Sequence, residues 1–372
     1  MNVPLLDVSA QNLPLQDRFV EKFREIVSSG GFILGPEVEA LEAEVAALSG
    51  AEFGIGVSSG TDALVVALMA AGVGPGDEVI CPAFTFFATA GSVERLGAVP
   101  VFVDVLPDTF NIDPEKLEAK VTRQTAAIIP VHLFGQAADM AAVMDIATRH
   151  HLTVIEDVAQ AIGARFADRG CGSIGDFGTF SFYPTKNLGG LGEGGLVTTN
   201  DPALAGRARA IRNHGMIERY RHDMIGGNFR LDAIQAGMLR IKLEQLDHYA
   251  LARRTNAARY LKQLGGISGL ALPHESDGCF HTWNQFTLRV TGGRRDELRA
   301  ALAGAGIGSE IYYPLTLDQQ PCFKDLPEHA LRDIEVSHQL ASECLSIPVY
   351  PEMALVQQDA VIAALKEFVG AA

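Results

Sequence analysis

Short apolar runs alternate with helix-length segments between about residues 37 and 200. The runs FGIGVSS, DEVICP, VPVFVDV, AAIIPVHLF and LTVIEDV are almost continuously apolar, which is typical of strands buried in a parallel sheet. The segment at 61–73, TDALVVALMAAGV, predicts a buried helix that ends at a glycine. Runs GTFSFYP and GLVTTN add further strands. The pattern predicts an α/β fold with helices on both faces of a mostly parallel sheet.

Several residues mark where the helices of this region begin. Pro36 follows a glycine and suits the first turn of a helix. Asp113 precedes a proline, and Asp139 precedes another helical stretch, so both are expected to cap helix N-termini. These signals support alternating strands and helices over this part of the chain.

The pattern changes near residue 250, after the segment LEQLDHYALARRTNAARYLKQL, which predicts one long helix. Beyond it, WNQFTLRV and IGSEIYYP favour strands, whereas RRDELRAALAGAG and DAVIAALKEFVG favour helices. We therefore predict a large α/β domain at residues 1–250 and a smaller α+β domain at residues 251–372. The N-terminal segment could pack on the small domain.

Composition and charge exclude several classes of protein. The formal net charge is −15 over 372 residues, which argues against nucleic acid or an anionic membrane as the main partner. No apolar run approaches the ~20 residues that span a bilayer, and the N-terminus lacks the regions of a signal peptide. The five cysteines are scattered and form no CxxC, so we expect no metal site and a reduced, cytoplasmic protein.

The glycine-rich stretch 190–195 spells GxGxxG, the pattern of a dinucleotide-binding turn. That turn needs a helix after the glycines, so that the pyrophosphate meets the helix N-terminus. Here the glycines lead into LVTTND, which predicts a strand. A Rossmann oxidoreductase or epimerase therefore remains only as a rival hypothesis.

Three other features could carry chemistry, although each also has a purely structural explanation. The segment 58–61 joins a strand to a helix and could seat a phosphate or simply cap the helix. Asp157 and its neighbour Glu156 end a buried strand, either beside a cation or in solvent. Lys186 lies among aromatic, proline and glycine residues. It is either a desolvated nucleophile or a surface lysine in a turn. Together they match the parts that hold pyridoxal 5'-phosphate.

With these motifs, the sequence resembles the DegT/DnrJ/EryC1/StrS family of nucleotide-sugar aminotransferases, which have the aspartate-aminotransferase fold type I. Matching motifs occur in order over almost the whole chain: SSGTDAL, DEVICPAFTFFAT, IIPVHLFGQ, VIEDVAQAIGA, SFYPTKNLGGLGEGG, RNHG, GGNFRLDAIQA and YYPLTLDQQP. The resemblance implies a mostly parallel, seven-stranded-type sheet with a smaller C-terminal α+β domain. It also implies a homodimer with shared active sites.

The resemblance assigns the cofactor-binding roles by motif position. Lys186 would form the Schiff base with pyridoxal phosphate, the internal aldimine, and would move the proton between cofactor and substrate. Asp157 would pair with the ring nitrogen, Gln160 would bind the phenolic oxygen, and Phe86 would stack on the ring. The resemblance also implies that the phosphate is held by Gly60, Thr61 and Ser181.

Further residues would complete the site. Asn228 would reach the phosphate in the partner subunit. The family usually has His-Tyr where this chain has a tyrosine pair, and tyrosine where this chain has Phe32. The residues that would face the sugar substrate are Phe32, Arg230, Tyr312 and Tyr313.

The resemblance predicts transfer of an amino group from an amino acid, L-glutamate, to a nucleotide-linked keto sugar. The motif SFYPxKNLGxxGxGG resembles that of enzymes acting on 3-keto hexoses. A 4-keto sugar aminotransferase of the same family and a pyridoxal-phosphate-binding sensor remain as alternatives. A nucleotide diphosphate would suit arginine contacts, so the arginines at positions 207, 209, 212, 219 and 221 are candidates for binding it.

Overall fold

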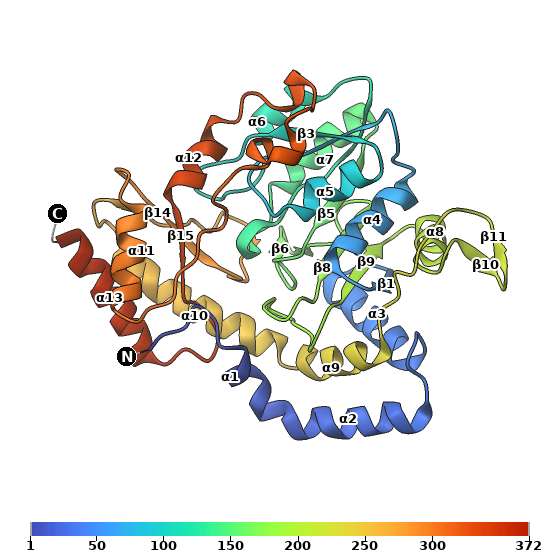
Figure 1. Cartoon of the computed structure of the whole chain (residues 1–372), viewed down its shortest axis with the longest axis horizontal. Helices are drawn as coiled ribbons and strands as arrows, with labels where there is room; N and C mark the ends of the chain where they lie inside the picture. Colours follow the sequence, from blue (N-terminus) through green and yellow to red (C-terminus); the bar gives the residue numbers. More distant parts are fainter. Residues whose placement is uncertain (1, 371–372) are drawn as a thin grey trace.

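A seven-stranded sheet forms the centre of the computed structural model, which describes residues 2–370 (Figure 1). The strand order is β1-β9-β8-β5-β4-β2-β3. Neighbours from β8 to β3 pair in parallel, whereas β9 runs antiparallel to both β1 and β8. The predicted mostly parallel sheet is therefore confirmed. Its strands are β1 (Phe53–Val57), β2 (Glu78–Pro82), β3 (Val99–Val103), β4 (Thr125–Ile128), β5 (Thr153–Asp157), β8 (Phe177–Ser181) and β9 (Gly195–Thr199).

Helices cover both faces of this sheet, because successive strand side chains point to opposite faces and both sets are apolar. One face packs against α4, α5 and α8. The other face packs against α3, α7 and α9. These helices are α3 (Pro36–Ser49), α4 (Gly60–Ala71), α5 (Ala88–Arg95), α7 (Met140–His150), α8 (Pro202–Arg212) and α9 (Ala233–Leu243).

The predicted helix signals act where the sequence places them. Pro36 is the first residue of α3, and the Asp139 side chain accepts a hydrogen bond from the Ala142 amide at the start of α7. Asp113 caps the short helix α6 (Pro114–Leu117) in the same way. Helix α4 begins after Ser59, whose side chain accepts from the Asp62 amide, and ends at Gly72 with a φ of 86°.

Two predicted elements differ from the structure. The strand AAIIPVHLF ends at Ile128, because the chain then turns through Pro130 into a 3₁₀ turn at Leu133–Gly135. Segment 307–314 is no strand; it makes only isolated bridges, and its tyrosines pack against an aromatic cluster instead. The long helix predicted over residues 243–264 is confirmed as α10, which begins at Leu246 and follows the separate helix α9.

Residues 246–370, which we call the C-terminal unit, enclose a second hydrophobic core around Trp283 and Phe286. An antiparallel sheet of order β12-β14-β15 lines this core, and Val3 reaches it from the N-terminus by a bridge to Ile307. The domain boundary near residue 250 remains a prediction and falls inside α10. The elements are α10 (Leu246–Leu264), α11 (Arg295–Gly304), α12 (Glu335–Glu343), α13 (Leu355–Gly370), β12 (Leu270–Ala271), β14 (Phe286–Val290) and β15 (Cys344–Ile347).

The other elements are mostly short and lie outside the central sheet. The β10–β11 hairpin projects from the end opposite the C-terminal unit (Figure 1). Within residues 2–370, no helix is both long and apolar enough to cross a membrane. The remaining elements are α1 (Val8–Asn12), α2 (Gln16–Ser29), β6 (Arg165–Phe166), β7 (Arg169–Gly170), β10 (Met216–Glu218), β11 (Arg221–His222) and β13 (Cys279–Phe280).

Candidate active site

The predicted cofactor residues converge at one edge of the central sheet. Asp157 is the last residue of β5 and Ser181 the last of β8, while β1 ends just before the turn into α4. Gly195, the first residue of the antiparallel β9, pairs with both Val57 and Ser181 at this same edge. Open α/β sheets bind ligands at the carboxyl ends of their parallel strands. The topology thus gathers segments that are more than one hundred residues apart.

Lys186 and Asp157 form the electrostatic centre of this edge. Burial lowers the pKa of Lys186 from its ordinary value of 10.5 to about 8, against the opposing charge of Asp157. The lysine side chain is still partly accessible. Burial also raises the pKa of the Asp157 carboxyl, so this group gains from a cation beside it. The pair offers a nucleophilic amine next to a carboxylate that favours a protonated partner.

Two groups from the surrounding chain orient the Asp157 carboxylate. The Thr89 hydroxyl donates to Oδ2 at 2.9 Å, and the Ala159 amide donates to Oδ1 at 3.1 Å. Thr89 is fully buried on α5. The sequence reasoning missed Thr89, and its only signal was its place three residues after Phe86 in the FTFFAT motif.

Gln160 is held between two segments. Its Oε1 accepts from the Phe134 amide at 2.7 Å, and its Nε2 donates to the Tyr313 hydroxyl at 3.1 Å. Of the two predicted tyrosines, Tyr313 therefore joins the cofactor residues. Tyr312 makes no hydrogen bond to Gln160; its ring packs beside Tyr313 at a centroid distance of 5.9 Å.

Phe86 differs from the two neighbouring phenylalanines that share its motif. Its side chain is 57% exposed and lies 6.2 Å from the Tyr313 ring, between centroids. Phe84 is fully buried in the core, and Phe87 stacks on Phe323 at 5.6 Å. Phe86 is thus the most exposed ring of the three, and it stays the predicted ring to stack on a planar ligand.

The start of α4 forms a cradle with the end of β8. A Cβ added to Gly60 would lie 2.6 Å from the Ser181 Cβ, so the two backbones approach as closely as glycine allows. The first amides of α4, including that of Thr61, have no partner within the helix and suit an anion. The Ser59 side chain caps this helix, so the capping interpretation is confirmed, and the phosphate-binding interpretation stays a prediction.

The GxGxxG glycines serve close packing. A Cβ on Gly195 would lie 2.3 Å from the Ser59 carbonyl oxygen, and a Cβ on Gly189, just before the stretch, would lie 2.3 Å from the Pro184 carbonyl oxygen. The stretch continues into strand β9 and not into a helix. The glycines therefore let the lysine loop lie against the α4 cradle, and the geometry of a dinucleotide-binding turn is missing.

Glu156 points to the opposite side of the strand from Asp157 and is fully buried. Its carboxylate accepts from the amides of Gly172, Ile174 and Gly175 and lies 2.9 Å from the His132 Nε2. These donors satisfy both oxygens, so the acidic pair does not end the strand in solvent. Because the His132 Nδ1 accepts from the Ala138 amide, this cluster is a satisfied hydrogen-bond network.

Other predicted residues lie apart from Lys186. Asn228 and Arg230 line a groove of about 310 Å³ beside Ser58, in the segment that bridges to the end of β1. Arg230 donates to the Asn213 side chain at 2.8 Å, and Asn228 is exposed. Phe32 is 43% exposed near this groove, next to Ile33 in its lining. Within one chain, these residues make no hydrogen bond to the Lys186 group.

The proposed arginine cluster is partly wrong. Arg212 is buried and donates to the Glu42 carboxylate and to the Gly56 carbonyl, so it holds α8 to the sheet and is not free for a diphosphate. Arg209 lies over the Phe53 ring at 5.6 Å, and Arg221 pairs with Asp223 on the exposed hairpin. Charge density along the sequence cannot distinguish such structural arginines from ligand contacts.

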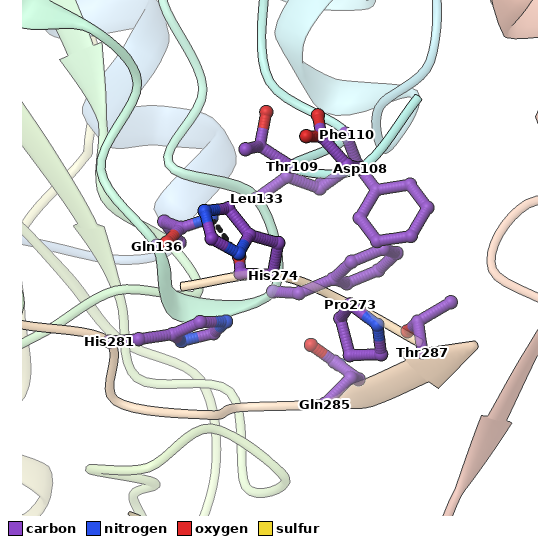
Figure 2. A pocket seen from close by; sticks show the side chains of 11 residues that line it. Asp108, Thr109, Phe110, Leu133, Gln136, Pro273, His274, His281, Gln285 and Thr287 are labelled. Carbon is purple, nitrogen blue, oxygen red and sulfur yellow. Dashed lines mark hydrogen bonds between the residues drawn. The ribbon is translucent and has the colours of Figure 1, made fainter. Parts of the chain in front are cut away.

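A separate small cavity lies between the loops 108–110 and 133–136 and the C-terminal unit (Figure 2). Its volume of about 10 Å³ suffices for roughly one water molecule. The Gln136 side chain donates to the His274 carbonyl at its wall, and the Gln285 Oε1 is buried without a protein partner. This cavity is far too small for a sugar nucleotide.

Comparison with known proteins agrees with this geometry. The model of the DegT/DnrJ/EryC1/StrS aminotransferase family matches residues 14–366. A pleiotropic regulatory protein of Geobacillus stearothermophilus is 50% identical, over 99% of both chains. The UDP-N-acetyl-3-dehydro-alpha-D-glucosamine 3-aminotransferase of Acidithiobacillus ferrooxidans is 46% identical, over 94% of both chains. The structure of S. venezuelae DesV in complex with a ketimine intermediate superposes with a TM-score of 0.95, 40% identity and coverage of 99% and 98%.

Proposed function

The chain belongs to the DegT/DnrJ/EryC1/StrS aminotransferase family, and from this premise we propose that it aminates a nucleotide-linked 3-keto hexose. The amino donor in this proposal is an amino acid, L-glutamate. The observation that carries the proposal is the desolvated Lys186 beside the buried Asp157, at the edge where the α4 cradle opens.

The residues at this edge suit pyridoxal phosphate. An exposed aromatic ring, a buried carboxylate that favours a cation and a cradle without side chains match the ring, nitrogen and phosphate of the cofactor. When bound, the cofactor supplies the electron sink for carbanion chemistry. Lys186 binds it covalently in this proposal, while Phe86, Asp157 and Gln160 orient its ring.

Lys186 also serves as the proton carrier between cofactor and substrate carbons. A pKa of about 8 leaves a useful fraction of the amine neutral near pH 7, whereas an ordinary lysine is almost wholly protonated. Asp157 stays ionised when a protonated nitrogen lies beside it. In this proposal Lys186 thus transfers the proton, and Asp157 stabilises the positive charge on the nitrogen beside it.

A 3-keto substrate is supported by two kinds of observation. The relative from Acidithiobacillus ferrooxidans is named as a 3-aminotransferase of a UDP-linked sugar, and a 41% identical relative from Streptomyces venezuelae as a dTDP-3-amino-3,4,6-trideoxy-alpha-D-glucose transaminase. The lysine motif of this chain agrees with that subgroup. The two relatives differ in the nucleotide, so the proposal leaves the base open.

We further propose that the working form is a homodimer with shared sites. Large apolar side chains are exposed on α2, on the β10–β11 hairpin and just after this hairpin. They include Phe23, Tyr220 and Ile225, the last two at 79% and 85%. Such side chains commonly mark a protein interface. Asn228 follows this hairpin and reaches the phosphate of the partner's site in the proposal.

A regulatory role is the second candidate, because the 50% identical relative is named a pleiotropic regulatory protein. Nothing in the Lys186 site is altered in a way that argues against turnover, since Lys186, Asp157 and Gln160 are all present. A regulatory role would therefore be added to catalysis in this chain.

Two measurements on the purified protein test the proposal. With pyridoxal phosphate, the protein is expected to show a yellow band that borohydride reduces, with the mass of the adduct on the peptide containing Lys186. L-Glutamate should bleach the band, and a panel of nucleotide-linked 3-keto and 4-keto sugars should restore it. Preferential turnover of 4-keto sugars would refute the substrate, and a band that glutamate never bleaches would favour the sensor.

A further inference from the structure

Asn187, directly after Lys186, is buried and carries a structural connection that the proposed chemistry does not use. Its Nδ2 donates to the Thr282 carbonyl at 3.1 Å, and its Oδ1 accepts from the Asn284 Nδ2 at 2.9 Å. Both partners belong to the C-terminal unit, more than ninety residues away in the chain. The residue beside the lysine is thus tied to that unit by two buried hydrogen bonds.

The segment 282–284 is itself firmly held. Arg253 of α10 is buried and donates to the main-chain carbonyls of Trp283 and Asn284, both at 3.1 Å. Trp283 packs in the second core, stacked on His281 at a centroid distance of 3.8 Å. A hydrogen bond to this segment therefore anchors the lysine loop to a firmly held part of the C-terminal unit.

The same segment also braces the loop that orients Gln160. The Asn284 amide donates to the Phe134 carbonyl at 2.8 Å, and the Thr282 amide donates to the Gly135 carbonyl at 2.9 Å. A Cβ on Gly135 would lie 2.9 Å from the Asn284 nitrogen, so this contact is as tight as backbone allows. Lys186 and Gln160 are therefore both positioned from the segment 282–284.

The Asn284 side chain makes one hydrogen bond in this arrangement. Its Nδ2 bonds to Asn187, whereas its Oδ1 is buried without a hydrogen-bond partner. A buried amide that leaves one atom unsatisfied costs stability, so packing alone gives no reason for asparagine here. The contact to Asn187 is the gain that offsets this cost.

We propose that Asn187 and Asn284 are positioning residues, which together fix the main chain at Lys186 relative to the C-terminal unit. This inference rests on the proposed role of Lys186 as the residue that binds the cofactor. The hydrogen bonds of the two side chains go to each other and to the Thr282 carbonyl, and none goes to Lys186, Asp157 or Gln160; in this proposal both asparagines act through the main chain at the lysine. The pair couples the lysine loop to the unit that carries Tyr313.

Asn284→Ala is the informative variant, because it keeps the main-chain bonds of segment 282–284 and removes the bond to Asn187. In the holoenzyme, we expect the pH midpoint of the visible band to rise by about 0.5 unit or more. A less tightly held lysine nitrogen is better hydrated, and hydration favours its protonated form. The dissociation constant of the cofactor should rise about tenfold. Asn187→Ala and the double variant should match each other, because the pair acts as one unit.

Asn256→Ala provides the matched control. Like Asn284, Asn256 is a buried asparagine, and it lies on α10. Its Nδ2 donates to the Tyr350 carbonyl at 2.9 Å and makes no bond to the lysine loop. This variant should lower the melting temperature but leave the band midpoint and cofactor affinity unchanged. Equal behaviour of the Asn284 and Asn256 variants would overturn the proposal, because the pair would then be merely structural.

Two outcomes separate this inference from the proposed function. A wild-type protein without a borohydride-trapped adduct at Lys186 refutes the proposed function itself. A wild-type protein with that adduct, but an Asn284→Ala variant with an unchanged midpoint, refutes only the positioning pair. If Asn284→Ala does not fold, Asn284→Ser keeps a polar group but is too short to reach Asn187, and it is measured in the same way.

Discussion

At the scale of single residues, the chemistry depends on how much water surrounds each charged group. Lys186 and Lys242 both have a pKa lowered by burial to about 8, yet they differ in accessibility. Lys186 is partly accessible at the sheet edge, whereas Lys242 is fully buried on α9. A lowered pKa marks a functional lysine only when a substrate can also reach it.

The pH dependence of lysine acylation in the cofactor-free protein tests this difference. Lys186 should react with a half-maximal rate near pH 8, because the amine is nucleophilic only when deprotonated, above its pKa. Lys242 should stay unlabelled in the folded protein. Asp157→Asn removes the charge that raises the pKa of Lys186, so the midpoint should move below 8. Peptide mass spectrometry measures both sites, and an upward shift would contradict the electrostatic account.

Phe86 and Phe87 form a natural pair of variants, since the Phe86 ring is the more exposed and the Phe87 ring is stacked on Phe323. Phe86→Ala should weaken cofactor binding about fivefold, from the loss of roughly 1 kcal/mol of aromatic stacking. Phe87→Ala should lower the melting temperature instead. Cofactor titration and thermal unfolding of both variants check this, and weaker binding in the Phe87 variant alone would reverse the assignment.

At the scale of elements, the cradle depends on the start of α4 lying against the ends of β8 and β9. Three glycine positions, Gly60, Gly189 and Gly195, permit contacts that a Cβ would prevent. The GxGxxG stretch was a misleading motif because its spacing matches a phosphate-binding turn. Only the strand that follows it shows that this stretch is no such turn, and we propose that the phosphate binds at Gly60 instead.

Gly60→Ala tests the cradle directly. The new Cβ would lie 2.6 Å from the Ser181 Cβ, so the strand end and the helix start must separate, at a cost of about 1–3 kcal/mol in stability. Weaker binding of both pyridoxal phosphate and inorganic phosphate is expected. Gly206→Ala is the matched helical control, because nothing lies within 4 Å of its added Cβ; it should bind normally and gain up to about 1 kcal/mol. Unchanged phosphate binding in the Gly60 variant would contradict the cradle.

At the scale of the whole molecule, the proposed cofactor site joins the central sheet to the C-terminal unit. The central sheet supplies Asp157 and Ser181, whereas Tyr313 and the brace at 282–284 come from the C-terminal unit. Asn228 and Arg230 lie in a groove of their own beyond Ser58. In the proposed homodimer, this groove contributes to the site of the second copy of the chain.

Subunit mixing tests the shared site. Lys186→Ala should be inactive, and Asn228→Ala should be strongly impaired in cofactor retention. After the two variants are unfolded and refolded together, mixed dimers contain one site with both native residues, so roughly a quarter of wild-type activity should return. Activity that stays at the level of the separate variants would show that each site is built from one chain.

The sequence by itself determined the features that depend on local chemistry. The alternation of apolar runs and helices, the caps at Asp113 and Asp139 and the motif around Lys186 all act over a few residues, so they could be predicted. The strand prediction for segment 307–314 was wrong for the opposite reason: its two tyrosines pack in an aromatic cluster, and the segment makes only isolated bridges. Its β-like composition could not reveal that partner.

Only the tertiary structure decided which distant groups meet. It separated Glu156 from Asp157 onto opposite sides of one strand, gave Arg212 a buried partner and placed Thr89 on the Asp157 carboxylate. It also joined Asn187 to Asn284 across ninety-seven positions of sequence. Hydrogen bonds of this kind depend on positions that the whole fold sets to within a fraction of an ångström, and no local pattern encodes them.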